Sequence, residues 1–223
     1  MLEELDRALR RERRFRDPLD LLHIDDEHLL RYFRLPREEI VHLCQELGPT
    51  IGRRTRRSHA LPVEGQLLIA LRFYASGSFQ SVIGDATRVH QSSVSRVIDS
   101  VTESLYRKGV REIKMPSGIE ERTTTTEKFA RKANFYKVIG AIDCTHIPIK
   151  APCVNEHLYV NRKNYHSLNC QVVCDAENLI LNCVARYPGS THDSFIWANS
   201  NLRQEFEQGE FGDNVLLGEY LDK

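Results

Sequence analysis

Two aspartates in the second half of the chain have the residue type and setting for metal chemistry. Asp143 interrupts an almost continuous apolar, β-favouring run from 138 to 149 (VIGAIDCTHIPI). A buried carboxylate there costs several kcal/mol unless it is paired or bound to a metal. Asp193 lies where the chain leaves Pro188-Gly189 and enters a helical pattern. Converging carboxylates form an oxygen cage for Mg²⁺ or Mn²⁺, and two such ions about 4 Å apart support phosphodiester cleavage.

Structural roles remain open for the same residues. Asp143 could cap a loop or pair with an arginine, and Asp193 could be an acid favoured at a helix start by the helix dipole. His146 and His192 lie close to these acids in the sequence. Each could orient a metal ligand or make a structural hydrogen bond.

The elements that must position the acids are predicted to be strands. The run 138–149 suits a central strand buried on both faces. Strands 168–174 and 179–185 follow, joined by a four-residue, hairpin-like link. A helix is expected over 193–207 and a last strand over 214–218. This order is compatible with a ribonuclease-H-like core.

The first half has helical periodicity instead. Apolar spacing predicts helical structure over 28–51, with Gly48-Pro49 as a stop, and then helices over 63–75, 79–87 and 91–106. The last two form a helix-turn-helix, an arrangement that reads DNA. Small polar and basic side chains open the second helix and suit a major groove: Gln91, Ser92, Ser93, Ser95 and Arg96. Helix pairs of this kind also occur in domains that bind nothing.

The charge distribution supports two roles on one chain. The 223 residues have a net charge of zero, but residues 1–137 hold 25 Lys and Arg against 20 Asp and Glu. Residues 138–223 hold 6 against 11, so the basic half could bind a polyanion and the acidic half a cation. No apolar stretch is long enough for a membrane span. Six cysteines without a CxxC pair favour a reducing compartment, the cytosol or nucleus.

Several motifs in order resemble the PIF/Harbinger transposase-derived nucleases, which are DDE superfamily endonucleases. The first is Ser76-Gly77-Ser78-Phe79-Gln80 with Gly84-Asp85 and 91–96 (QSSVSR). The others are 142–147 (IDCTHI) with 149–152 (IKAP), 159–163 (YVNRK) with 166–171 (HSLNCQ), and 188–194 (PGSTHDS). The match extends from about residue 28 to 218.

The resemblance implies a metal-dependent DNA nuclease in which Asp143 is the first catalytic acid and Asp193 is a further metal-binding acid. Glu219 stands where the family has an aspartate, and the family's last glutamate is absent, so truncation and inactivity are expected possibilities. Family members work in the nucleus, and also the cytoplasm, beside a Myb/SANT-like DNA-binding protein. The alternative is a non-catalytic DNA- or protein-binding module in the nucleus.

The predicted fold is α+β: an N-terminal helical, helix-turn-helix region followed by a partial ribonuclease-H-like α/β nuclease core. We expect a charged N-terminal segment at 1–27, the helical DNA-binding region at 28–110, a connector at 111–137 and the partial DDE nuclease domain at 138–223. Expected ligands are DNA and Mg²⁺ or Mn²⁺.

Overall fold

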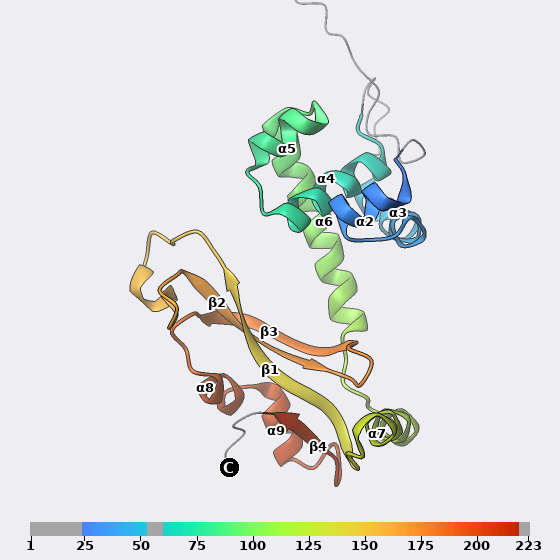
Figure 1. Cartoon of the computed structure of the whole chain (residues 1–223), viewed down its shortest axis with the longest axis vertical. Helices are drawn as coiled ribbons and strands as arrows, with labels where there is room; N and C mark the ends of the chain where they lie inside the picture. Colours follow the sequence, from blue (N-terminus) through green and yellow to red (C-terminus); the bar gives the residue numbers. More distant parts are fainter. Residues whose placement is uncertain (1–23, 53–59, 219–223) are drawn as a thin grey trace, which may run out of the picture. The chain divides into compact units, whose positions relative to one another are not determined.

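The computed structural model describes residues 24–52 and 60–218 (Figure 1). The chain divides into two compact units, Met1–Gly109 and Val110–Lys223. Most of the predicted segment 1–27 lies outside the described residues, as does Glu219. Residues 111–137, described above as a connector, belong to the second unit.

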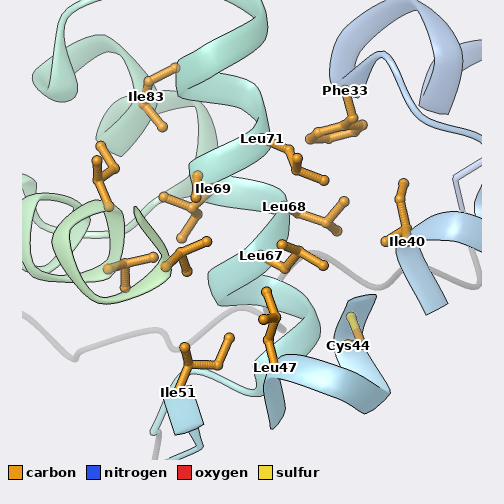
Figure 2. Close-up of a cluster of buried hydrophobic side chains, with 14 of the residues drawn as sticks. Phe33, Ile40, Cys44, Leu47, Ile51, Leu67, Leu68, Ile69, Leu71 and Ile83 are labelled. Carbon is orange, nitrogen blue, oxygen red and sulfur yellow. The ribbon is translucent and has the colours of Figure 1, made fainter. Parts of the chain in front are cut away.

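The first unit is helical and is built around one central helix. Its elements are α2 (Asp26–Phe33), α3 (Arg37–Ile51), α4 (Val63–Ser76), α5 (Gln80–Thr87) and α6 (Gln91–Glu112). Every residue of α4 from Gly65 to Leu71 is buried. Figure 2 shows Leu68 and Leu71 of α4 on the side of Phe33 and Ile40, and Ile69 on the side of Ile83. A helix that is apolar on all sides belongs in the middle of a helical core.

The expected stop at Gly48-Pro49 is wrong, because α3 continues to Ile51 with Pro49 inside it. Proline removes a single helical hydrogen bond, and the helix ends two residues later. Leu47 and Ile51 are four residues apart and both are buried, 4% exposed each. Their packing against the core holds this last turn.

The helix pair predicted to read DNA is present. A three-residue link joins α5 to α6, close to the predicted boundaries. Gly84 makes the turn tight, because a Cβ atom on it would lie 2.6 Å from the Val89 carbonyl oxygen. The Val89 N–H in turn donates to the Gly84 carbonyl at 2.9 Å.

The second unit carries a four-stranded sheet in the order β3-β2-β1-β4. Its elements are α7 (Ile119–Ala133), β1 (Val138–Pro148), η2 (Glu156–Tyr159), β2 (Ser167–Cys174), β3 (Ile180–Pro188), α8 (Asp193–Ala198), α9 (Asn201–Glu207) and β4 (Val215–Gly218). Strand β1 pairs antiparallel with β2 and parallel with β4, while β2 and β3 are antiparallel. The predicted α+β class is therefore confirmed, and the sheet is consistent with a partial ribonuclease-H-like core.

The core of this unit lies on the face of the sheet next to α9. Ile142 on β1 pairs with Val173 on β2, and both pack with Leu202 of α9 and with Phe211. In a separate cluster, Phe129 of α7 packs with Val138 and Ala176. Both clusters lie at the Val138 end of β1, away from its Pro148 end.

Two expectations for this unit are corrected. Strand β1 is buried only over its first half: Asp143, Thr145 and Ile147 are exposed. The helix expected over 193–207 is two helices, α8 and α9. Ser200 starts the second one, because its hydroxyl accepts a hydrogen bond from the Arg203 N–H at 3.1 Å, as N-cap residues do.

Candidate active site

Asp143 lies on the central strand, at the point where its apolar half ends. It follows the buried Ile142 and is itself exposed. Its Oδ1 accepts a hydrogen bond from the Cys144 N–H at 2.8 Å. The expectation of a buried carboxylate is therefore wrong, and solvent access removes the desolvation cost on which it rested. An exposed carboxylate on a rigid strand can instead meet a ligand from solution.

Asp193 is the first residue of α8, so it follows the third strand and opens a helix as predicted. Its side chain is also exposed. One of its oxygens accepts a hydrogen bond from Asn169 Nδ2 at 2.7 Å. The same Asn169 nitrogen donates to the Thr191 carbonyl at 2.9 Å. Asn169 lies on β2, so the sheet itself holds this acid.

Both aspartates act on the thiol of Cys144. Burial raises the pKa of this thiol to about 12, and the negative charges of Asp193 and then Asp143 reinforce the shift. A hydrogen bond from Gln171, its cross-strand partner, opposes it. Asp143 and Asp193 are 50 positions apart in the sequence, yet in the structure both lie close enough to Cys144 to act on its thiol. Their convergence on one cation stays a prediction.

Reasoning from single residues missed a row of polar side chains on β2. Ser167, Asn169 and Gln171 alternate along the strand and are all buried, at 0%, 1% and 2% exposure. Alternate residues share one face of a strand, so the three lie together, opposite Cys144 and His146 of β1. The signal was in the sequence as polar residues at every second position of an otherwise apolar strand.

The two histidines near the acids differ in their surroundings. His146 Nδ1 lies 3.1 Å from Ser167 Oγ, which also accepts a hydrogen bond from Asn161 Nδ2 at 2.9 Å. His146 thus takes part in a buried polar network beside Asn169. His192 precedes α8 at its N-cap position, where its side chain makes no capping hydrogen bond.

The described residues supply part of a metal site. Asp143 and Asp193 offer exposed carboxylate oxygens, which are the ligands that Mg²⁺ and Mn²⁺ prefer. Within residues 24–52 and 60–218, no three His, Cys, Asp or Glu side chains gather closely enough to hold a metal ion. Glu219, the third predicted ligand, lies outside the described residues. Strand β4 reaches Gly218, which pairs with Ile142 directly before Asp143.

The predicted DNA-reading residues occupy the first turns of α6. Gln91, Ser92 and Arg96 are exposed, whereas Ser93 and Ser95 are half-buried. Arg96 Nε donates to the Ser92 carbonyl at 2.9 Å, and Ser92 Oγ lies 2.8 Å from His90 Nδ1. The face opposite these residues carries Val94, Val97 and Ile98 into the core. Contact of these residues with DNA stays a prediction.

Comparison with known proteins defines the class to which this sheet and its acids belong. Residues 142–220, from β1 through β4, match the family model described as DDE superfamily endonuclease. No solved structure matches the chain significantly.

The chain is similar over most of its length to curated proteins that carry the name of a nuclease. It is 40% identical over 203 residues to the Rattus norvegicus protein named "Putative nuclease HARBI1", covering 91% of this chain and 58% of that protein. The human protein of the same name is 38% identical with the same coverage. The Arabidopsis thaliana "Protein ALP1-like" is 30% identical over 80% of this chain and 45% of its own length. The chain thus spans 58% of the length of the rat and human proteins and less than half of the Arabidopsis protein.

Proposed function

We propose that this chain is a metal-dependent DNA endonuclease derived from a Harbinger transposase, which hydrolyses phosphodiester bonds. The observation that carries the proposal is the placement of Asp143 on the central strand and of Asp193 at the start of α8, with both charges acting on Cys144. The family match covers the same elements, and the DDE superfamily generally uses divalent metal ions.

In this proposal Asp143 and Asp193 bind Mg²⁺ or Mn²⁺, with Glu219 as a third ligand. Divalent ions bound there would activate water and stabilise the leaving oxygen. The chain's own part is to keep two carboxylates exposed and oriented on the sheet. The helix-turn-helix of α5 and α6 would bind the substrate duplex through the first turns of α6.

The cellular setting is proposed from the family alone. The chain would act in the nucleus, and also occur in the cytoplasm, beside a Myb/SANT-like DNA-binding protein. Co-purification of such a protein with the tagged chain would test the partnership. No helix within the described residues is long and apolar enough to cross a membrane.

A plasmid-nicking assay tests the function. We expect supercoiled plasmid to be nicked in Mg²⁺ or Mn²⁺ and not in EDTA, with nicking lost in Asp143→Asn and Asp193→Asn. Asp213→Asn is the matched control, because Asp213 is 90% exposed and lies 3.5 Å from Lys137, which precedes β1. Val138, the residue after Lys137, is five residues from Asp143, about 16 Å along the strand. The control substitution at Asp213 is therefore made at the end of β1 that is far from Asp143. DNA binding without metal-dependent nicking would contradict the proposal and favour the non-catalytic binding module.

A further inference from the structure

The amide of Asn169 has its hydrogen-bond donors committed to the segment that carries Asp193. The side chain is 1% exposed, and its Nδ2 donates to Asp193 Oδ1 at 2.7 Å and to the Thr191 carbonyl at 2.9 Å. A hydrogen bond to a carboxylate is about twice as strong as one between neutral groups. Asn169 therefore ties the acid at the start of α8 to the second strand of the sheet.

The orientation of this amide is fixed by its neighbours. If the amide were rotated by half a turn, its oxygen would face the Asp193 carboxylate and the Thr191 carbonyl, which are both acceptors. In the observed orientation Asn169 Oδ1 is buried without a hydrogen-bond partner. A buried unpartnered oxygen costs about 1–3 kcal/mol, which offsets part of what the two donor bonds contribute to stability. Such a group in a native structure calls for an explanation.

The local backbone does little to orient Asp193. Helix α8 has six residues, and its N-cap, His192, makes no side-chain capping hydrogen bond. Among the described residues, the Asp193 side chain interacts with Asn169 and with the Cys144 thiol. An exposed aspartate would otherwise sample several rotamers, and a metal ion would have to select one of them.

We propose that Asn169 is a positioning residue that holds the Asp193 carboxylate in its metal-binding orientation. This rests on the proposed function, in which Asp193 is a metal ligand. Asn169 pairs across the strands with His146, three residues from Asp143 on β1. Asn169 thus fixes Asp193 relative to β1, the strand that carries Asp143. Residues that orient metal ligands in this way typically change metal affinity by about 10–100-fold when they are replaced.

The test is Mn²⁺ binding to the full chain, followed through the electron paramagnetic resonance signal of free Mn²⁺. Asn169→Leu keeps the shape and removes both the donor and the unpartnered oxygen. We expect it to weaken Mn²⁺ binding by about 10–100-fold. Asn182→Leu is the matched control, because Asn182 is a half-buried asparagine on β3, and it should change binding little.

A double-mutant cycle separates positioning from a general effect on the fold. If Asn169 acts through Asp193, Asn169→Leu should have little further effect on the residual Mn²⁺ affinity of Asp193→Ala. An equal loss in both backgrounds would show that Asn169 only supports the structure. An unchanged affinity in the single variant would also overturn the proposal.

Failure of the proposed function gives a different result. If the unaltered chain binds no Mn²⁺, the metal-dependent function fails, and amide hydrogen exchange of the metal-free chain still decides the role of Asn169. The Thr191 and Phe195 amides donate to the Pro188 and His192 carbonyls, respectively. In Asn169→Leu both should exchange faster than in Asn182→Leu. Equal exchange in the two variants would mean that Asn169 does not hold this segment.

Discussion

Replacing Gly84 by alanine sets two effects of opposite sign against each other. Gly84 lies inside α5, and alanine is favoured over glycine in a helix by about 1 kcal/mol. A Cβ atom at this position, however, would lie 2.6 Å from the Val89 carbonyl oxygen. The neighbouring atom is backbone, so it cannot rotate away as a side chain would.

The steric effect is the larger of the two. Overpacking of this kind costs about 1–3 kcal/mol, and opening the turn would also weaken the 2.9 Å hydrogen bond from Val89 N–H to the Gly84 carbonyl. We therefore expect Gly84→Ala to lower the free energy of unfolding by about 1–2 kcal/mol after the helix-propensity gain is subtracted. Gly65→Ala is the control, since a Cβ there meets side-chain carbons at 3.5 Å or more, and it should stabilise α4 by up to about 1 kcal/mol.

Urea unfolding of the full chain measures both variants. Circular dichroism at 222 nm follows the helices, most of whose residues lie in the first unit, and Trp197 fluorescence reports on the second unit separately. The helical transition should move to lower urea in Gly84→Ala and to higher urea in Gly65→Ala, with the Trp197 transition unchanged. If the Gly84 variant is as stable as the original chain, the turn between α5 and α6 is not closed as described.

Three further substitutions have definite expected outcomes. Ser200→Ala removes the N-cap of α9, so it should lower the free energy of unfolding by about 1 kcal/mol in the Trp197-monitored transition. Burial, with the Glu64 charge as a smaller cause, raises the pKa of the Cys44 thiol from 9.0 to about 11. Because the thiol ionises more readily in the unfolded chain, stability should fall as the pH rises from about 9 toward 11, and a urea series should show a smaller fall in Cys44→Val. Arg96→Ala should weaken duplex binding and reduce the slope of log K against log salt by about 0.9, as measured by fluorescence anisotropy. An unchanged slope would mean that Arg96 contacts no phosphate.

The order of elements could be predicted because hydrophobic periodicity is a local property. The helix pair and the turn between its members were predicted, although α6 continues to Glu112 and does not end at 106. The hairpin between β2 and β3 was recognised from its short polar link. The structure adds the reason: Asp175 Oδ1 accepts from the Glu177 and Leu179 N–H groups, at 2.8 Å each. Side chains that bond their own turn need no tertiary partner.

Burial and helix breaks were predicted less well, because they depend on what packs against an element. The apolar spacing of Phe195, Ala198, Leu202 and Phe206 continues across the break between α8 and α9, so it indicated one helix. The signal for two was Ser200, an N-cap residue in the middle of the pattern. The exposure of Asp143 could not be predicted, because the sequence of β1 does not show that its second half is left uncovered.

The acids and the residue that holds one of them differ in how visible they are in a sequence. Asp143 and Asp193 stand out by charge and by family motif. Asn169 and Gln171 are uncharged, and in the sequence they are marked only by their polar type at alternate positions of an apolar strand. Only the structure shows that their carbonyl oxygens are buried without partners and that the Asn169 donors face Asp193.

The two halves of β1 depend on each other through strand register. Successive side chains on a strand point to opposite faces, so a slip of one residue would move every side chain to the other face. Ile142 and Val173, paired and buried at 5% and 0% exposure, prevent that slip between β1 and β2. The same register sets Cys144 opposite Gln171 and His146 opposite Asn169. The apolar half of the sheet therefore fixes the face from which Asn169 reaches Asp193, and a substitution at Val173 that loosens the pairing should disturb the site without touching either acid.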